Sequence, residues 1–216
     1  MFNTIFPKIH KEGYKFLAIS ILITFIVLLF SQFLGVIFIL ITIWVYYFFR
    51  DPERYPLNDD TYLVSPADGL ITDISDRNGP VELQLENTSF TRISIFMNVF
   101  NCHVNRTPVS GTVEEIYYKP GKFLNASLDK ASEENERNYY KIKCNKSGEE
   151  IIVVQIAGLI ARRIVCEVEQ KQNLEQGERI GMIRFGSRVD VYLKNKKILA
   201  KLGQNVVAGE SLIASE

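Results

Sequence analysis

The chain has 216 residues, with 25 basic and 25 acidic side chains and no net formal charge. This balance argues against a general nucleic-acid-binding protein, which carries a clear basic excess. Its three cysteines, Cys102, Cys144 and Cys166, are odd in number and widely spaced, so they predict neither a disulfide framework nor a zinc site. We expect free thiols in a reducing compartment, and we predict no metal site.

The first predicted element is an apolar segment, residues 16–49, which contains no charged side chain. As a single helix it would be about 51 Å long at ~1.5 Å per residue, whereas the hydrocarbon core of a bilayer is only ~30 Å thick. The polar break at Ser31-Gln32 therefore predicts two short helices, about residues 15–31 and 34–49, that form a membrane hairpin. One long, tilted span is the alternative.

Charged residues on both sides of this segment predict its orientation. Positive flanks at both ends favour a hairpin whose two ends lie on the cytoplasmic side. We therefore expect residues 1–50 to anchor the chain in the cell (inner) membrane and residues 51–216 to form a domain on its cytoplasmic side. The flanking basic residues are Lys8, Lys11, Lys15, Arg50 and Arg54.

After a Pro-containing linker at residues 51–56, the pattern changes to short β-type runs. They are rich in Val, Ile, Tyr and Phe and are separated by Gly, Pro, Asn or Asp, which is typical of strands. One helix is expected within 125–136, where Asn125 or Ser127 would cap it, and the polar composition fits a loop equally well. The predicted strands are 70–75, 81–86, 91–99, 111–118, 138–144, 150–157, 162–169, 180–185, 189–193 and 197–201.

Two pairs of glycine-centred segments resemble each other within the chain. Residues 66–71 resemble residues 108–113, and residues 174–180 resemble residues 206–212. Turns of this kind between short strands look like the β-hammerhead hairpins of lipoyl and biotinyl carrier domains. The predicted fold is therefore a mostly β domain of hammerhead-like hairpins with few short helices, preceded by the α-helical membrane hairpin.

Polar residues follow the apolar strand predicted at 91–99, and they mark a candidate site. His103 is the only histidine after the membrane segment. A cluster of structural hydrogen bonds is the alternative interpretation. Cys102 and His103 point to opposite sides of an extended chain, so a Cys–His nucleophilic pair is not expected. The cluster consists of Asn98, Asn101, His103, Asn105 and Arg106.

A Gly186-Ser187 pair lies between two β-type runs and permits a specific reaction, although such a pair is usually only a turn. Glycine leaves its carbonyl sterically open. The Ser187 hydroxyl can then attack the Gly186 carbonyl, and elimination and hydrolysis would leave a pyruvoyl group at a new N-terminus. Asp68, in Ser65-Pro66-Ala67-Asp68-Gly69, either stabilises a turn or orients or deprotonates a serine hydroxyl.

These segments combine with three others into a pattern that covers about residues 47–216. Together they resemble the phosphatidylserine decarboxylase family, particularly its short bacterial and archaeal branch. The segments are Phe49-Arg50-Asp51-Pro52, Ser65-Pro66-Ala67-Asp68-Gly69, Asn98–Pro108, Gly121-Lys122-Phe123-Leu124-Asn125-Ala126, Glu134-Asn135-Glu136-Arg137 and Phe185-Gly186-Ser187-Arg188.

The resemblance implies an enzyme that makes its own cofactor. Autocatalytic cleavage between Gly186 and Ser187 would give chains 1–186 and 187–216, which stay associated without a covalent link. Ser187 would become a pyruvoyl group, which forms a Schiff base with phosphatidylserine and serves as an electron sink for the loss of CO₂. The product would be phosphatidylethanolamine. Oligomeric state, including a homo-oligomer, is left open.

The resemblance also implies residue roles, with one departure. Ser187, Gly186, His103 and Asp68 match catalytic positions, and His103 is the candidate to protonate the carbanion or polarise the adduct. Arg106 stands where the long branch has a second histidine, so Asp68, His103 or main-chain strain remain alternatives for activating Ser187. Candidates for binding the phosphodiester and the acyl chains are Arg162, Arg163, Arg188 and Lys122, and Phe123 and Leu124, respectively.

Three other functions fit parts of the pattern. A membrane-tethered lipoyl- or biotinyl-like carrier would use a lysine such as Lys130 in Asp129-Lys130. An inactive scaffold of the same fold would leave the chain intact. A pyruvoyl enzyme acting on another serine lipid, such as an ether lipid, would use the same headgroup chemistry.

Overall fold

The computed structural model describes residues 7–121, 134–158, 163–184 and 187–216. The chain divides into two compact units, Met1–Glu53 and Arg54–Glu216. The predicted helix at 125–136 lies mostly outside the described residues.

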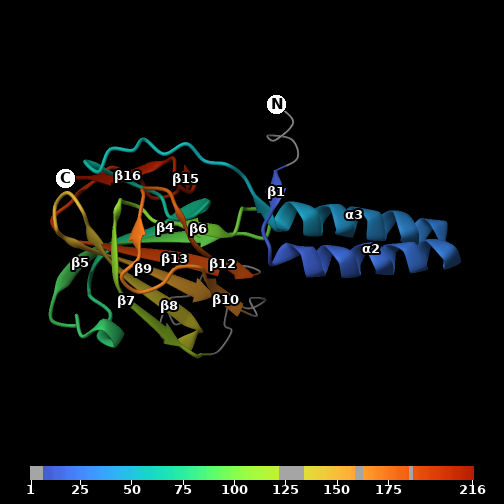
Figure 1. Ribbon diagram of the computed structural model, residues 1–216, viewed down its shortest axis with the longest axis horizontal. Coiled ribbons are helices and arrows are strands. Elements are labelled where there is room, and N and C mark those ends of the chain that lie inside the picture. The colour runs from blue at the N-terminus through green and yellow to red at the C-terminus, as the bar shows by residue number, and fades with distance from the viewer. Residues whose placement is uncertain (1–6, 122–133, 159–162, 185–186) are drawn as a thin grey trace. The chain divides into compact units, whose positions relative to one another are not determined.

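The first unit is a helical hairpin. Helices α2 (Gly13–Phe30) and α3 (Gln32–Phe48) lie side by side (Figure 1) and are separated only by Ser31, whose backbone is extended. The Ser31 Oγ accepts a hydrogen bond from the Leu34 N–H at 3.4 Å, which caps α3. The predicted pair of helices is confirmed, and the single long span is wrong.

Small and hydroxylated side chains hold the two helices together. Thr42 Oγ1 lies 2.7 Å from Ser20 Oγ and 2.8 Å from Thr24 Oγ1. At Gly35, a Cβ would lie 2.2 Å from Leu28 Cδ2, so any larger residue would require the Leu28 side chain to move. Small residues and shared hydroxyl hydrogen bonds are the usual means of helix packing in an apolar environment.

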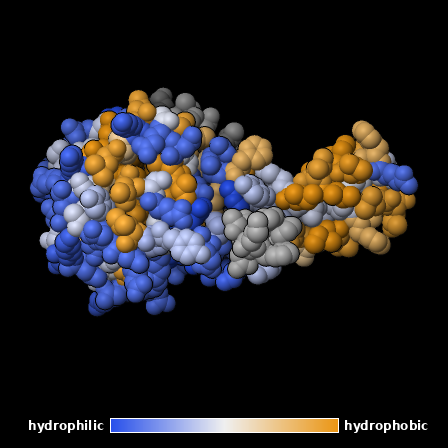
Figure 2. Space-filling view, turned by 90° about the horizontal axis from the view of Figure 1, so that it is seen from above, coloured by the Kyte–Doolittle hydropathy of each residue, from blue (hydrophilic) through white to orange (hydrophobic). Residues whose placement is uncertain are grey.

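The outer surface of the hairpin is apolar, and its two ends meet. Helix α2 has a mean hydropathy of 2.2, and by length and composition it can cross a membrane. On the face that Figure 2 shows, the surface of the hairpin is mostly hydrophobic. Strand β1 (Lys8–Ile9) pairs antiparallel with β2 (Arg50–Asp51), which fixes the entry and the exit of the hairpin next to each other.

The second unit is built on an eight-stranded antiparallel sheet with two three-stranded sheets (Figure 1). In spatial order the large sheet contains β11 (Asn173–Leu174), β7 (Gly111–Lys119), β8 (Arg137–Cys144), β9 (Glu150–Ala157), β13 (Ser187–Leu193), β5 (Ser89–Met97), β4 (Gly69–Asn78) and β15 (Asn205–Val206). The small sheets are β10 (Arg163–Cys166), β12 (Arg179–Arg184) and β6 (Val104–Arg106), and β14 (Lys197–Ile198), β16 (Leu212–Ser215) and β3 (Tyr62–Val64).

The mostly β prediction is confirmed, with one strand that is wrong. Residues 81–86 contain a 3₁₀ helix, η1 (Val81–Leu83), which ends at Gln84 in the left-handed region (φ 57°). Pro80 precedes this turn and accepts backbone hydrogen bonds from Leu83 and Leu85, so the segment folds over instead of extending. Leu83 then packs into a small apolar cluster.

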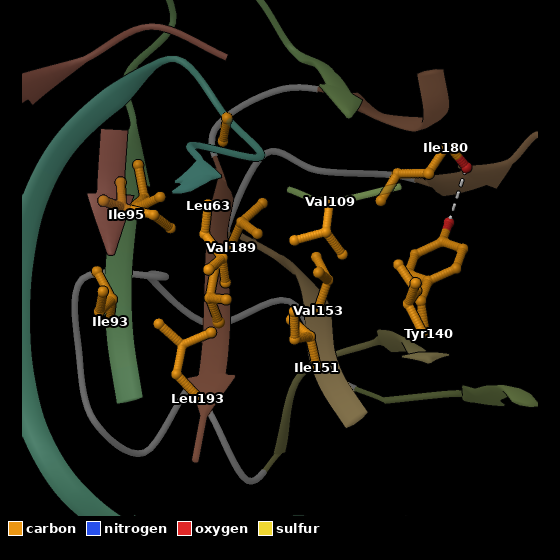
Figure 3. Packing of buried hydrophobic residues seen from close by; sticks show 14 of the residues in the cluster. Leu63, Ile93, Ile95, Val109, Tyr140, Ile151, Val153, Ile180, Val189 and Leu193 are labelled. Atoms are coloured by element: carbon orange, nitrogen blue, oxygen red, sulfur yellow. Dashed lines mark hydrogen bonds between the residues drawn. The ribbon is translucent and has the colours of Figure 1, made fainter. Parts of the chain in front are cut away.

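Alternation along the central strands separates two faces of the large sheet. Val189, Val191 and Leu193 of β13 lie in the main core, together with the inward residues of β5 and β9. Figure 3 shows Val189 and Leu193 between Ile93 and Ile95 on one side and other core side chains on the other. Arg188, Asp190 and Tyr192 alternate with the core residues and therefore face the other side of the sheet.

The two pairs of similar segments form two equivalent crossovers. In one, residues 66–71 lie beside residues 206–212, and in the other, residues 108–113 lie beside residues 174–180. Gly209 N–H donates to Ser65 O at 2.8 Å, and Gly177 N–H donates to Thr107 O at 3.0 Å. The two glycines have φ values of 76° and 78°, respectively. The crossovers also bind each other, because Val64 N–H donates to Pro108 O at 3.0 Å and Arg106 N–H donates to Pro66 O at 2.9 Å.

Candidate active site

Ser187 begins the central strand β13, between β5 and β9. Its register partners are Met97 on β5 and Ala157 on β9, and its side chain therefore shares the core face with Val189. Ser187 is 0% exposed, and its Oγ has no hydrogen-bond partner among the described residues. A buried hydroxyl without a partner is uncommon and is a candidate for a functional group. Gly186 lies outside the described residues.

His103 immediately precedes β6 and is also fully buried. Its backbone carbonyl accepts the Ile183 N–H at 3.2 Å. Its Nδ1 lies 3.0 Å from the Asn101 carbonyl oxygen, which can only accept a hydrogen bond. The neutral ring therefore carries its proton on Nδ1, and Nε2 is the nitrogen able to take up another proton.

Asp68 is bound to partners other than Ser187. Its carboxylate accepts two hydrogen bonds from Arg54 Nη2, at 3.0 and 2.8 Å, and one from the Ala208 N–H at 2.8 Å. In the equivalent crossover, Ser110 Oγ accepts the Gln176 N–H at 3.2 Å. The contact of Asp68 with Ala208 thus repeats a structural contact that a neutral serine makes in the other half.

A buried polar network, which sequence reasoning did not identify as a unit, connects strands β6, β9 and β8 and contacts Met97, the register partner of Ser187. Asn105 Oδ1 accepts a hydrogen bond from Gln155 Nε2 at 2.8 Å, and Gln155 Oε1 accepts one from the Tyr140 hydroxyl at 2.7 Å. All three residues are 0% exposed. The Tyr140 hydroxyl also lies 3.1 Å from Ile180 O (Figure 3). Burial raises the pKa of Tyr140 well above its ordinary value, so the hydroxyl remains a donor.

Gly181 makes room for this network. It pairs with Asn105 between β12 and β6. A Cβ at Gly181 would lie 2.1 Å from Val165 O and 3.1 Å from the Tyr140 hydroxyl, and the backbone φ is 154°. Glycine is therefore required here by both space and conformation.

A second group of polar residues holds the neighbouring strand. Asn135 Nδ2 donates to Ala157 O at 2.6 Å, and Ala157 N–H donates to Glu136 O at 3.0 Å. Asn135 and Glu136 belong to the Glu134–Arg137 segment, for which no role is predicted from the sequence, and they hold Ala157, the register partner of Ser187. Gln155 had a sequence signal, as the single polar residue in the apolar run 151–157.

The opposite face of the sheet carries an ion-pair network. Arg188 Nε lies 2.9 Å from Asp190 Oδ1, and both side chains are buried, so Arg188 is placed away from Ser187. Arg163 is exposed at the start of β10, and Arg162, Lys122, Phe123, Leu124 and Lys130 lie outside the described residues. A cavity of about 440 Å³ opens on this opposite face, lined in part by Glu82, Lys119 and Arg137.

Glu82 is held in its ionised form by the cations of this cavity. Burial by itself raises the pKa of Glu82. The hydrogen bond from Lys119 at 2.8 Å and the charge of Arg137 at 3.3 Å outweigh burial, so the pKa lies below its ordinary value of 4.5.

Comparison of the sequence with known proteins identifies the family. The family model described as phosphatidylserine decarboxylase matches residues 41–214. A phosphatidylserine decarboxylase proenzyme of Pelagibacter ubique is 66% identical over 216 residues, which is 100% of both chains. Proenzymes of Ruegeria pomeroyi and Rickettsia typhi are 50% and 49% identical over 215 residues; these cover 99% of this chain and 98% and 92% of the relatives. With most of its length matched to the model and high identity to whole relatives, the chain belongs to the phosphatidylserine decarboxylase family.

Proposed function

We propose that this chain cleaves itself between Gly186 and Ser187 and then converts phosphatidylserine to phosphatidylethanolamine and CO₂ with a pyruvoyl group made from Ser187. The observation that carries the proposal is the buried Ser187 hydroxyl at the start of the central strand, which has no hydrogen-bond partner among the described residues, in a member of this decarboxylase family. The fit is chemical as well, because the hydroxyl of the residue that must become the cofactor makes no competing hydrogen bond with any described residue.

The cleavage balances without an external oxidant. Ser187 Oγ adds to the carbonyl of Gly186, the C–N bond breaks, and an ester replaces the peptide bond. Removal of the Ser187 Cα proton expels the Gly186 carboxylate and leaves dehydroalanine. Its tautomer takes up water and releases ammonia, which leaves a pyruvoyl group at residue 187. A half-time near one hour requires a barrier of about 22 kcal/mol, which a positioned hydroxyl and a few donors can supply.

His103 is the proposed proton carrier, and Asp68 the proposed support. Nε2 of the neutral imidazole is able to accept the Ser187 hydroxyl proton, and the Nδ1 contact with Asn101 O fixes the tautomer. Arg106 cannot replace a second histidine as a base; its guanidinium donates to Gly177 O at 2.8 Å. Asp68, paired with Arg54, is proposed to hold the crossover that leads into β4.

Once formed, the pyruvoyl carbonyl supplies the electron sink that decarboxylation of an amino acid requires. The chain's own contribution is a buried site at residue 187, which lies between Met97 and Ala157, with Asn105 in contact with Met97. His103 is proposed to return a proton to the carbon that loses CO₂. The two cleavage products are proposed to stay together, because β13 pairs with β5 and β9 along most of its length.

We also propose a location. A lipid substrate and an apolar helical hairpin with adjoining ends agree with attachment to the cell (inner) membrane, and basic residues at both ends of the hairpin favour the cytoplasmic side.

Denaturing electrophoresis with intact-mass analysis tests the proposal. We expect wild-type protein in lipid nanodiscs to give fragments 1–186 and 187–216, the second with a pyruvoyl N-terminus, and to release CO₂ from phosphatidylserine. The variant Ser187→Ala should remain one chain and be inactive. The matched control is Ser94→Ala, because Ser94 is also buried, its Oγ has no partner among the described residues, and it lies on the other face of β5.

Three results would contradict the proposal. An intact wild-type chain that still decarboxylates the lipid would exclude the cofactor. An intact, inactive wild-type chain would favour the scaffold. Decarboxylation of other serine lipids with equal efficiency would remove phosphatidylserine as the specific substrate but retain the chemistry.

A further inference from the structure

The Asn105 side chain has a donor that its neighbours use poorly. Its Oδ1 is engaged by Gln155 at 2.8 Å, whereas its Nδ2 has only two long contacts, each 3.5 Å, to Pro66 O and to Met97 Sδ. Ordinary N–H···O hydrogen bonds are about 2.9 Å long, and a thioether sulfur is a weak acceptor. A fully buried amide group thus retains donor capacity, although buried polar groups are normally well satisfied.

This donor contacts the strand neighbour of the residue that must react. Met97, which Asn105 contacts, is the register partner of Ser187 in the β5–β13 pair. Side chains of directly opposed residues lie on the same face of a sheet, so Asn105 reaches the face that carries the Ser187 hydroxyl. Arg106 is the next residue along β6, and its guanidinium binds Gly177 O. Asn105 is a neutral donor, whereas the charged Arg106 is engaged at Gly177.

The network behind Asn105 fixes the direction of its amide. The Tyr140 hydroxyl donates to Gln155 Oε1, and Gln155 Nε2 donates to Asn105 Oδ1. Because the carbonyl end of Asn105 is occupied, its N–H₂ end is turned toward Met97. A donor held in this way before the reaction does not need to reorient when charge appears.

We propose that Asn105 Nδ2 donates a hydrogen bond to the oxyanion that forms on the scissile carbonyl, directly before Ser187, when the Ser187 hydroxyl adds to it. The electron pair of the C=O bond moves to this oxygen as the C–O bond forms and returns when the C–N bond breaks. Gln155 and Tyr140 are positioning residues that orient the amide. This inference rests on the proposed self-cleavage and names the group that stabilises its transition state.

The rate of self-cleavage tests the assignment. Full-length chains are made by cell-free synthesis in nanodiscs, pulse-labelled and followed by electrophoresis. Removing one oxyanion donor typically slows a reaction by about 10²–10³-fold, and we expect Asn105→Ala to slow cleavage by about this factor. Tyr140→Phe, which loses only the far end of the network, should have a smaller effect of about 10-fold or less.

The near-isosteric variant Asn105→Asp separates a donor from a structural role. A carboxylate has no proton to donate, whereas a protonated carboxyl group has one. The cleavage rate of Asn105→Asp relative to wild type should therefore rise as the pH falls from about 8.5 to 5.5, an interval that covers the pKa values that buried carboxyl groups reach. The relative rate of Asn105→Ala should not change. Thermal unfolding of each variant in the Ser187→Ala background shows whether the fold is retained.

The outcomes separate this inference from the proposed function. If wild-type protein cleaves and a folded Asn105→Ala cleaves within about twofold of it, Asn105 is not the donor, and self-cleavage stands. A relative rate of Asn105→Asp that does not change with pH would also overturn the assignment. If wild-type protein never cleaves, the proposed function fails as well.

Discussion

Asp68 provides the sharpest test of how this fold is held together. The sequence predicts Asp68 either in a turn or in contact with a serine hydroxyl, and in the structure its carboxylate binds Arg54 and the Ala208 N–H. We consider Asp68→Ala in the Ser187→Ala background, so that cleavage does not alter the chain during the measurement. The variant leaves the buried Ala208 N–H without its acceptor, and it leaves Arg54 with Glu210, at 4.0 Å, as its carboxylate partner among the described residues.

The size of the effect follows from these two losses. An unsatisfied buried N–H costs about 1–3 kcal/mol. Breaking a fully buried ion pair costs about 3–5 kcal/mol, but the Arg54 and Asp68 side chains are 15% and 12% exposed, so we reduce this to about 1–2 kcal/mol. The sum is about 3 kcal/mol. For a chain of this length each kcal/mol lowers the unfolding midpoint by about 2–4 °C, which predicts a decrease of about 6–12 °C.

The matched variant comes from the equivalent crossover. Asp68→Ser restores the kind of acceptor that Ser110 offers to Gln176, so it should recover about 1 kcal/mol, or about 2–4 °C, relative to Asp68→Ala. Unfolding midpoints are compared in the same nanodiscs at one heating rate. An Asp68→Ala chain as stable as its parent, or an Asp68→Ser chain less stable than Asp68→Ala, would refute the equivalence of the two crossovers.

Three further predictions concern separate parts of the molecule. Gly181→Ala should cost about 2–4 kcal/mol of unfolding free energy through overpacking and backbone strain, whereas Gly148→Ala, at φ 72° with open space, should cost only about 1–2 kcal/mol. Ser20→Cys combined with Thr42→Cys should form a disulfide on oxidation in membranes, detected as lost maleimide labelling, because the native hydroxyl oxygens are 2.7 Å apart. Glu82→Gln should lower the unfolding midpoint at pH 7, and its deficit should shrink as the pH falls below the ordinary glutamate pKa of 4.5, since the lowered pKa stabilises the fold only above that range.

Each of these predictions has a clear opposing result. Equal losses of unfolding free energy in the Gly181→Ala and Gly148→Ala variants would mean that neighbouring residues move and relieve the crowding at Gly181. Continued labelling of both cysteines would favour a single straight helix, in which residues 20 and 42 would be about 33 Å apart. A deficit of Glu82→Gln that persists unchanged at pH 3 would show that the carboxylate does not stabilise the fold through its charge.

The sequence by itself determined the parts of this protein that depend on local pattern. The uncharged segment and its break at Ser31 predicted two helices, because bilayer thickness and helix rise leave few other arrangements. Alternating β-branched residues predicted most strands. The strand predicted at 81–86 was wrong, because Pro80 and the left-handed backbone of Gln84 fold this segment into a turn despite its apolar residues.

A candidate chemistry could also be predicted, because Gly186-Ser187 lies between two β-type runs and His103 is the only histidine after the membrane segment. Only the tertiary structure decided what surrounds them. The strand register places Met97 and Ala157 opposite Ser187. Packing of β6 places Asn105 within hydrogen-bonding distance of Gln155, and the crossover places Asp68 within hydrogen-bonding distance of Arg54. These contacts join residues far apart in the chain, and no local pattern specifies them, because pairing is set by the free energy of the whole packed core and not by any one segment.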